Sequence, residues 1–198
     1  MPVPPFDPRP IVLRGRHVTL EPLAAHHAEA LFAAAGDDAV WAFLPRPRPR
    51  SLEEVRAMIR EAAREDGSIA FAIVPVATGA AAGSTRYLDI DRSHRTLEIG
   101  WTWIGPAWQR TAVNTECKLL LLAHAFDDLG AHRVTLKTDG RNERSQRAIE
   151  RIGATREGVL RRHRVCWDGY VRDTVYFGVT DLDWPRVREG LVARLGAP

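Results

Sequence analysis

The stretch from residue 108 to residue 118, WQRTAVNTECK, contains residue types that favour phosphate binding at the start of a helix. It lies between an aromatic run, residues 96–104, and an apolar run that ends at Gly130. The first turn of a helix offers free backbone N–H groups and the positive end of the helix dipole, and both attract phosphate. Arg110 adds a charge that favours a diphosphate, and Ala112 is nearly as small as glycine. The stretch is therefore a candidate phosphate loop, although it contains no glycine.

Two polar residues in this loop, Thr111 and Asn114, have a simpler interpretation. Both residue types are common N-caps of ordinary core helices. Asn114 is also one of the few non-glycine residues that tolerate a positive φ, and we expect it to help the backbone turn here. Taken alone, the loop is more typical of a plain helix cap, and only the order of the surrounding elements favours phosphate.

The elements that position the loop follow from hydrophobic periodicity and turn residues. Alternating apolar residues predict strands, whereas apolar residues three or four apart after a capping residue predict helices. The expected order is a strand over 12–23, helices over 26–36 and 51–62, antiparallel strands over 69–76, 81–90 and 96–104, a helix over 114–130, a strand over 132–138, a helix over 142–153, a hairpin of strands over 154–166 and 170–180, and a last helix from about residue 183.

A strand, a helix and a strand between residues 96 and 138 imply a parallel crossover. The predicted fold class is thus α/β of the α+β kind, with a mixed, mostly antiparallel central sheet, one parallel crossover and flanking helices. The chain has 198 residues, which suits one compact domain over 11–198 after a proline-rich arm over 1–10. Without an apolar run of roughly 18 residues or a secretory core, the sequence predicts no membrane span and a cytoplasmic location.

Metal and nucleic-acid binding are not expected. The two cysteines form no C-x-x-C pair, His26 and His27 lack a third ligand at metal spacing, and the acidic run at 89–91 lacks the glycine and glutamate of a calcium loop. The net charge is only +3, and Lys118 and Lys137 are the only lysines among the basic residues. Nucleic acid is therefore not an expected partner at this modest charge.

With this order of elements, the chain resembles the GNAT superfamily of acyl-CoA-dependent N-acetyltransferases. Within it, the chain is similar to the RimJ/RimL-like branch of ribosomal-protein alanine and serine N-acetyltransferases. The likeness covers roughly residues 11–185 and is carried mainly by LEIGWTWI, QRTAVNTECKLLLLAHAFDDLG, RVTLKTDGRNERSQRAIERIGA, EGVLRRH and GYVRDTVYFGV. The family's phosphate motif has small residues at two positions that Ala112 and Asn114 occupy here, so the sequence departs from it at both.

The resemblance implies acetyl-CoA as co-substrate and a set of residues that bind it. The family pairs the amide arm of the cofactor with the strand over 96–104, and it places residues of the helix over 142–153 beside the pantetheine and the sulfur. The implied binding residues are Trp103, Ile104, Gln109, Arg110, Thr111, Ala112, Val113, Asn114, Thr115, Asn142 and Ser145.

The implied reaction is direct attack of a neutral amine on the thioester, which requires a base, an oxyanion donor and a hydrogen bond to the leaving thiolate. Glu98 is the candidate base, acting directly or through water; the alternative is that it pairs with an arginine on a solvated strand face. Many family members use a tyrosine as general acid, but the helix over 142–153 has none. Either Ser145 takes this role or the thiolate leaves unaided.

The sequence leaves the acceptor and the assembly open. The resemblance implies a primary amine, either a protein N-terminus or a small amine. The alternative function is a catalytically silent GNAT-like module that binds acyl-CoA as a sensor. A homodimer is possible, because the closing hairpin and Trp184 are able to cover either a neighbouring subunit or the core.

Overall fold

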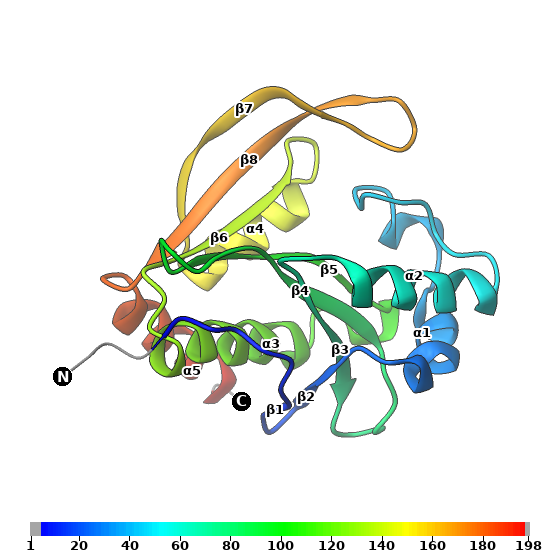
Figure 1. Ribbon diagram of the computed structural model, residues 1–198, viewed down its shortest axis with the longest axis horizontal. Helices are drawn as coiled ribbons and strands as arrows, with labels where there is room; N and C mark the ends of the chain where they lie inside the picture. The colour runs from blue at the N-terminus through cyan, green and yellow to red at the C-terminus, as the bar shows by residue number, and fades with distance from the viewer. Residues whose placement is uncertain (1–4, 197–198) are drawn as a thin grey trace.

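An eight-stranded sheet with helices on both faces forms the structure, a computed structural model that describes residues 5–196 (Figure 1). The strands lie in the order β1-β2-β3-β4-β5-β6-β8-β7. They are β1 Leu13–Arg14, β2 Val18–Pro22, β3 Ile69–Pro75, β4 Gly83–Asp91, β5 Thr96–Ile104, β6 Arg133–Asp139, β7 Thr155–Val165 and β8 Val171–Thr180. The α-helices are α1 Ala28–Ala34, α2 Leu52–Arg64, α3 Ala112–Ala123, α4 Glu143–Ile152 and α5 Trp184–Gly196.

The predicted fold class is confirmed. Strands β3, β4 and β5 form the expected antiparallel meander, and β5 pairs with β6 in parallel through the crossover helix α3. The closing hairpin also forms, with β8 inserted between β6 and β7. All neighbouring strands in the sheet are antiparallel except β5 and β6.

Several predicted boundaries were wrong. The single strand expected over 12–23 is two strands, because the chain turns back at Gly15, whose N–H donates to the Val18 carbonyl. The helix expected over 26–36 begins with a 3₁₀ turn over Ala25–His27. The helix expected over 114–130 starts at Ala112, and its last turn, His124–Asp128, is π-helical. Such wide turns depend on tertiary contacts, which hydrophobic periodicity does not report.

Alternate residues of the strands supply two apolar cores, one on each face of the sheet. In β3, Phe71 and Ile73 belong to the main core beneath α3 and α5, whereas Ala72 and Val74 belong to the smaller core beneath α1 and α2. This alternation follows from the two-residue period of a strand. Figure 1 shows α3 and α5 on one side of the sheet and the β7–β8 hairpin arching away on the other.

The N-terminal segment is partly built into the main core. Residues 1–4 of the expected proline-rich arm lie outside the described residues. In the remainder, Phe6 is buried in the main core, and its ring centre lies 5.8 Å from the Arg95 guanidinium. This part of the arm is therefore packed against the domain, because burial of a large aromatic side chain is strongly favourable.

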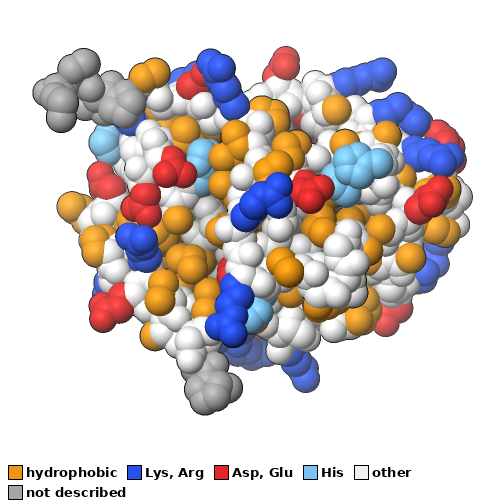
Figure 2. Space-filling view, turned by 90° about the horizontal axis from the view of Figure 1, so that it is seen from below, with side chains coloured by type: hydrophobic (Ala, Val, Ile, Leu, Met, Phe, Trp, Pro, Cys, Tyr) orange, Lys and Arg blue, Asp and Glu red, His pale blue; other side chains and the backbone are white. Residues whose placement is uncertain are grey.

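The face that carries α3 and α5 has mixed charges. In Figure 2, which views the molecule from below Figure 1, basic and acidic side chains alternate over this face and do not gather by sign. No helix within residues 5–196 is long and apolar enough to cross a membrane.

A buried carboxylate fastens α3 to the first hairpin. Glu116 accepts hydrogen bonds from the backbone N–H groups of Arg16, His17 and Val18, at 2.8, 2.6 and 2.7 Å. The side chain is buried, and a Cβ atom at Gly15 would lie 2.4 Å from its Cδ atom, so glycine is required there. Three donors that converge on one carboxylate fix the position of α3 relative to the sheet.

We expect Glu116→Ala to lower the free energy of unfolding by about 3 kcal/mol, because three N–H groups, that of Val18 buried and the other two partly buried, lose their acceptor. Urea denaturation at 25 °C measures this loss. The control is Glu143→Ala, which removes an exposed pair with Arg147 and should cost less than about 0.5 kcal/mol. Equal losses in the two variants would contradict the anchoring role of Glu116.

Candidate active site

The central feature of the candidate site is a gap between the two parallel strands. β5 and β6 pair only through Thr96, Leu97 and Glu98 on the β5 side, opposite residues 133–135. Beyond Glu98, β5 stays paired with β4, and beyond residue 135, β6 stays paired with β8. The inner edges of both strands are therefore unpaired in this region, and their N–H and C=O groups are available to an extended ligand.

A β-bulge in β5 opens this gap. Gly100 lies opposite Arg86 of β4 and Trp103 lies opposite Ser84, so Trp101 and Thr102 together face the single residue between them. Trp101 has a φ of 50°, which a non-glycine residue adopts rarely. A bulge with an extra residue bends its strand, and here the bend lies where β5 separates from β6.

The candidate phosphate loop leads from β5 into α3. Thr111 is the N-cap, and its hydroxyl accepts from the Val113 N–H at 3.3 Å. Within residues 5–196, no acceptor lies in hydrogen-bonding distance of the N–H groups at positions 110, 111 and 112. The positive φ, 62°, is at Arg110. The expectation that Asn114 turns the backbone and caps the helix is therefore wrong, because Asn114 already lies inside the first helical turn.

The side chain of Gln109 links this loop to the second helix of the site. Its Nε2 donates to the Ile104 carbonyl at 3.0 Å, and its Oε1 accepts from Arg144 of α4 at 3.1 Å. The predicted loop residues and the predicted helix residues are thus brought to the same end of the gap. At the start of α4, the side chain of Asn142 caps the helix by accepting from the Ser145 N–H at 3.1 Å. The Ser145 hydroxyl has no hydrogen-bond partner in the part of the chain that the structure describes.

Glu98 lies on the opposite face of the sheet from α3, in a buried ion pair. The side chain is 3% exposed, and its Oε2 lies 2.5 Å from the Nζ of Lys137 on β6. Burial raises the pKa of Glu98, and Lys137 counteracts part of that rise. A Cβ atom at Gly100 would lie 2.5 Å from Glu98 Oε1, so the carboxylate leans along β5 toward the bulge. The alternative interpretation of Glu98, a pair with an arginine on a solvated face, is wrong, because the partner is a lysine in a buried position.

Other titratable groups surround this pair. Lys137 also lies 3.4 Å from Asp89 and 6.0 Å from the ring centre of Tyr176. The Tyr176 ring lies 5.8 Å from that of His163, whose pKa is lowered by burial and by nearby cations. The pair at Glu98 therefore belongs to a cluster that spans β4, β5, β6, β8 and β7 on one face of the sheet.

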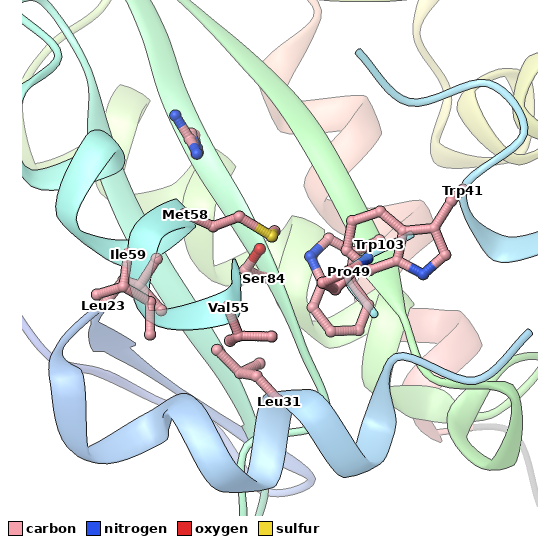
Figure 3. A pocket seen from close by; sticks show the side chains of 10 residues that line it. Leu23, Leu31, Trp41, Pro49, Val55, Met58, Ile59, Ser84 and Trp103 are labelled. Atoms are coloured by element: carbon pink, nitrogen blue, oxygen red, sulfur yellow. The ribbon is translucent and has the colours of Figure 1, made fainter. Parts of the chain in front are cut away.

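A small apolar cavity adjoins the bulge on this face. Its volume is about 20 Å³, room for one water-sized group. Trp103 and Trp41 lie at one side of it, and Met58, Val55 and Leu23 lie at the other (Figure 3). Trp101 is outside the cavity and stacks against Arg86, whose guanidinium lies 4.3 Å from its ring centre. Trp103 thus lines the cavity and Trp101 does not, because the bulge turns Trp101 away.

Arg141 connects the two segments that overhang this face. Its guanidinium lies 3.5 Å from the Tyr170 ring centre in the β7–β8 hairpin and 5.5 Å from that of Phe43, in the loop after α1. Asp139, which is buried, holds Arg141 with hydrogen bonds at 2.8 and 3.0 Å. The hairpin and the loop between α1 and α2 are thereby joined beside the end of β6.

A third metal-type ligand accompanies the two histidines, contrary to expectation. The ligand atoms of Glu21, His26 and His27 lie within 4.8 Å of one another. Both nitrogens of His27 already have partners, the Ala24 N–H at 3.1 Å and the Glu21 carboxylate at 3.2 Å. The group therefore acts as a hydrogen-bonded helix start, and metal-free function stays a prediction. Cys117 is buried, and burial raises the pKa of its thiol to about 11.

Sequence reasoning missed Lys137, Lys118 and the Asp139–Arg141 pair. One signal was present in the sequence: Lys118 and Lys137 are the only lysines, and all other basic side chains apart from histidine are arginine. The structure places both lysines beside the gap. The partner of Glu98 was not predictable, because it follows from the parallel register that places residue 98 opposite residue 135.

In Lys137→Met, we expect Glu98 to stay buried without its cation, so that its pKa rises further. A raised carboxyl pKa gives stability that is complete below the ordinary value near 4.5 and is lost as the pH rises through the folded-state pKa. The variant should thus lose about 3 kcal/mol of unfolding free energy between pH 4.5 and pH 8 relative to the wild type, in urea titrations. Adding Glu98→Gln should remove this pH dependence; a loss of equal size at both pH values would refute the pairing.

Comparison with known proteins agrees with this arrangement. A model of the acetyltransferase (GNAT) domain family matches residues 17–155. A crystal structure of a GCN5-related N-acetyltransferase from Brucella melitensis is 34% identical, with a TM-score of 0.92, and covers 96% of this chain and 87% of that one. A structure from T. thermophilus, named "putative acetyltransferase", is 41% identical, with a TM-score of 0.87, over 95% of this chain and 98% of that one.

Two further likenesses are more distant in sequence. "Putative ribosomal N-acetyltransferase YdaF" of Bacillus subtilis (strain 168) is 29% identical over 106 residues, 54% of this chain and 57% of YdaF, which supports the RimJ/RimL-like placement. The acetyltransferase MccE, solved with acetyl-CoA and AMP, shares the fold at a TM-score of 0.74 and 20% identity, over 84% of this chain and 93% of that one. On the matched family model, the sheet order and the gap between β5 and β6, the chain belongs to the GNAT acetyltransferase family.

Proposed function

We propose that the protein transfers an acetyl group from acetyl-CoA to a primary amine by direct attack. The observation that carries this proposal is the coincidence of three features at one place. The inner edges of β5 and β6 are unpaired, the N–H groups at the start of α3 have no acceptor among residues 5–196, and Gln109 joins that helix start to α4. An extended ligand with a diphosphate at one end fits such an arrangement.

In this proposal the loop between β5 and α3 holds the diphosphate. The N–H groups from Arg110 to Ala112 face it, and the Arg110 side chain, which is exposed, adds charge. The backbone of β5 around Trp103 and Ile104 pairs with the amide arm, and Asn142 and Ser145 border its far side. Val113, Asn114 and Thr115 complete the helix turn that supports the loop.

Glu98 is the proposed base. A carboxylate whose pKa is raised by burial takes up a proton more readily than an exposed one, while Lys137 favours its ionised form. The amine passes a proton to Glu98, its nitrogen forms a bond to the acyl carbon, and the carbon–sulfur bond breaks. The leaving thiolate receives a hydrogen bond from the Ser145 hydroxyl, which no other described group engages.

The acceptor enters, in this proposal, from the face that carries Glu98. This face is bordered by α2, by the loop after α1 and by the β7–β8 hairpin. Arg141 contacts both the loop and the hairpin. A chain terminus or a small amine is compatible with such an opening. The name of YdaF favours a protein N-terminus, and an amine panel distinguishes the two.

The turnover experiment measures thiol release from acetyl-CoA with a panel of N-terminal peptides and small amines. We expect wild-type turnover with at least one class, and a fall in kcat of about 10²-fold or more in Glu98→Gln, because the amine loses its base. Glu143→Gln, an exposed carboxylate on α4, is the matched control and should retain the wild-type rate. Tight acetyl-CoA binding without turnover in the wild type would favour the alternative, a silent acyl-CoA sensor.

The proposed diphosphate site is tested by Ala112→Ile, which places a branched side chain at the helix start. We expect the affinity for coenzyme A, measured by calorimetry, to fall at least about tenfold, because close approach of the backbone N–H groups is blocked. The same substitution at Ala193, exposed on α5, controls for helix propensity and should leave affinity unchanged. Undiminished affinity in Ala112→Ile with an intact fold would leave the loop as an ordinary cap.

A further inference from the structure

Lys118 on α3 is a buried amine without an anionic partner. The residue is 5% exposed, and no carboxylate of residues 5–196 lies within salt-bridge distance of its Nζ. Its one hydrogen bond is to the Thr102 hydroxyl at 2.8 Å. Two of its three possible donor positions are therefore unused. Burial lowers the pKa of Lys118, as expected for a cation removed from water.

The partner of Lys118 is part of the bulge that opens the gap. Thr102 follows Trp101, the residue with the positive φ, and its hydroxyl also lies 2.8 Å from that of Thr85 on β4. The two threonines lie opposite each other in the bulge, so a polar chain runs from α3 through β5 to β4. This series of hydrogen bonds joins α3 to β5 and β4 at the place where β5 separates from β6.

Lys118 and Glu98 lie on opposite faces of the sheet. Glu98 alternates in β5 with Leu97 and Ile99, which belong to the main core beneath α3, so its side chain points away from that helix. The gap is thus flanked by a carboxylate on one face and an ammonium on the other. A reaction in which an amine gives up a proton on the first side and a carbonyl oxygen gains negative charge on the second suits this polarity.

A buried cation without a counterion destabilises a fold, and a hydrophobic residue of similar length would usually be more stable there. Residues that are costly to the fold are found where a function needs them. Apart from the two threonines, Lys118 has buried apolar neighbours on α3, which are Cys117, Leu121 and Leu122. Packing alone therefore does not explain a lysine at this position.

We propose that Lys118 is a positioning residue for acyl transfer, which rests on the proposed function. Through Thr102 it holds the backbone of the bulge at the unpaired edge of β5, where the thioester carbonyl binds. Its positive charge also favours the negative charge that develops on that oxygen. Lys118 does not touch the acceptor amine, which enters from the side of Glu98.

The test is Lys118→Met, which keeps the length of the side chain and removes its charge and donors. We expect kcat to fall at least about tenfold while the KM for acetyl-CoA changes less than about threefold, because the loss affects the transition state and not ground-state binding. The melting temperature should be equal to or above that of the wild type, since the desolvated amine is gone. Leu120→Met, on the same helix and partly buried, is the matched control and should retain wild-type kcat.

Two results would overturn this inference. If kcat in Lys118→Met stays within about twofold of the wild type, Lys118 has no part in the reaction. If kcat and the melting temperature fall together, Lys118 stabilises the fold and is not a positioning residue for the reaction. A wild-type chain that turns over no amine refutes the proposed function itself, whereas an active wild type with an unaffected Lys118→Met refutes only the inference.

Discussion

The rest of the structure depends on the early end of the hydrogen bonding between β5 and β6. A parallel pair buried in a sheet normally continues along its whole length, because every unpaired N–H or C=O group is costly. Here it stops after Glu98, and the bulge at Trp101 and Thr102 prevents it from resuming. The outer edges of both strands remain paired, so the gap is held open by the sheet itself and does not rely on loops.

Several interactions described above fix this gap from outside. Glu116 ties α3 to the first hairpin, Gln109 ties the entry of α3 to α4, and Lys118 ties α3 to the bulge. All of them act on the crossover helix, which is the element that connects the two separated strands. The free N–H groups at its start are consequently held in a fixed relation to the inner edges of β5 and β6. Rigid elements position a site more accurately than flexible loops do.

The order of elements was predictable from the sequence, because periodicity and capping residues are local signals. The cap at Asn142 and the strand that carries Glu98 were accessible in this way, whereas α3 was expected to start at residue 114 and starts at Ala112. The partner of Glu98, the position of the positive φ at Arg110 and the bulge at Trp101 were not. Each depends on the register between strands distant in sequence, which one sequence does not report. The binding and catalytic roles of these residues stay predictions.

The placement of the two lysines has a chemical consequence for the protein itself. Lys118 is buried, and Lys137 is 12% exposed and engaged by Glu98. All other long basic side chains are arginines, whose guanidinium stays protonated and is a poor nucleophile. A thioester that diffuses over the described surface therefore meets no freely accessible lysine amine. The amines of Lys118 and Lys137 are consequently shielded from acylating reagents.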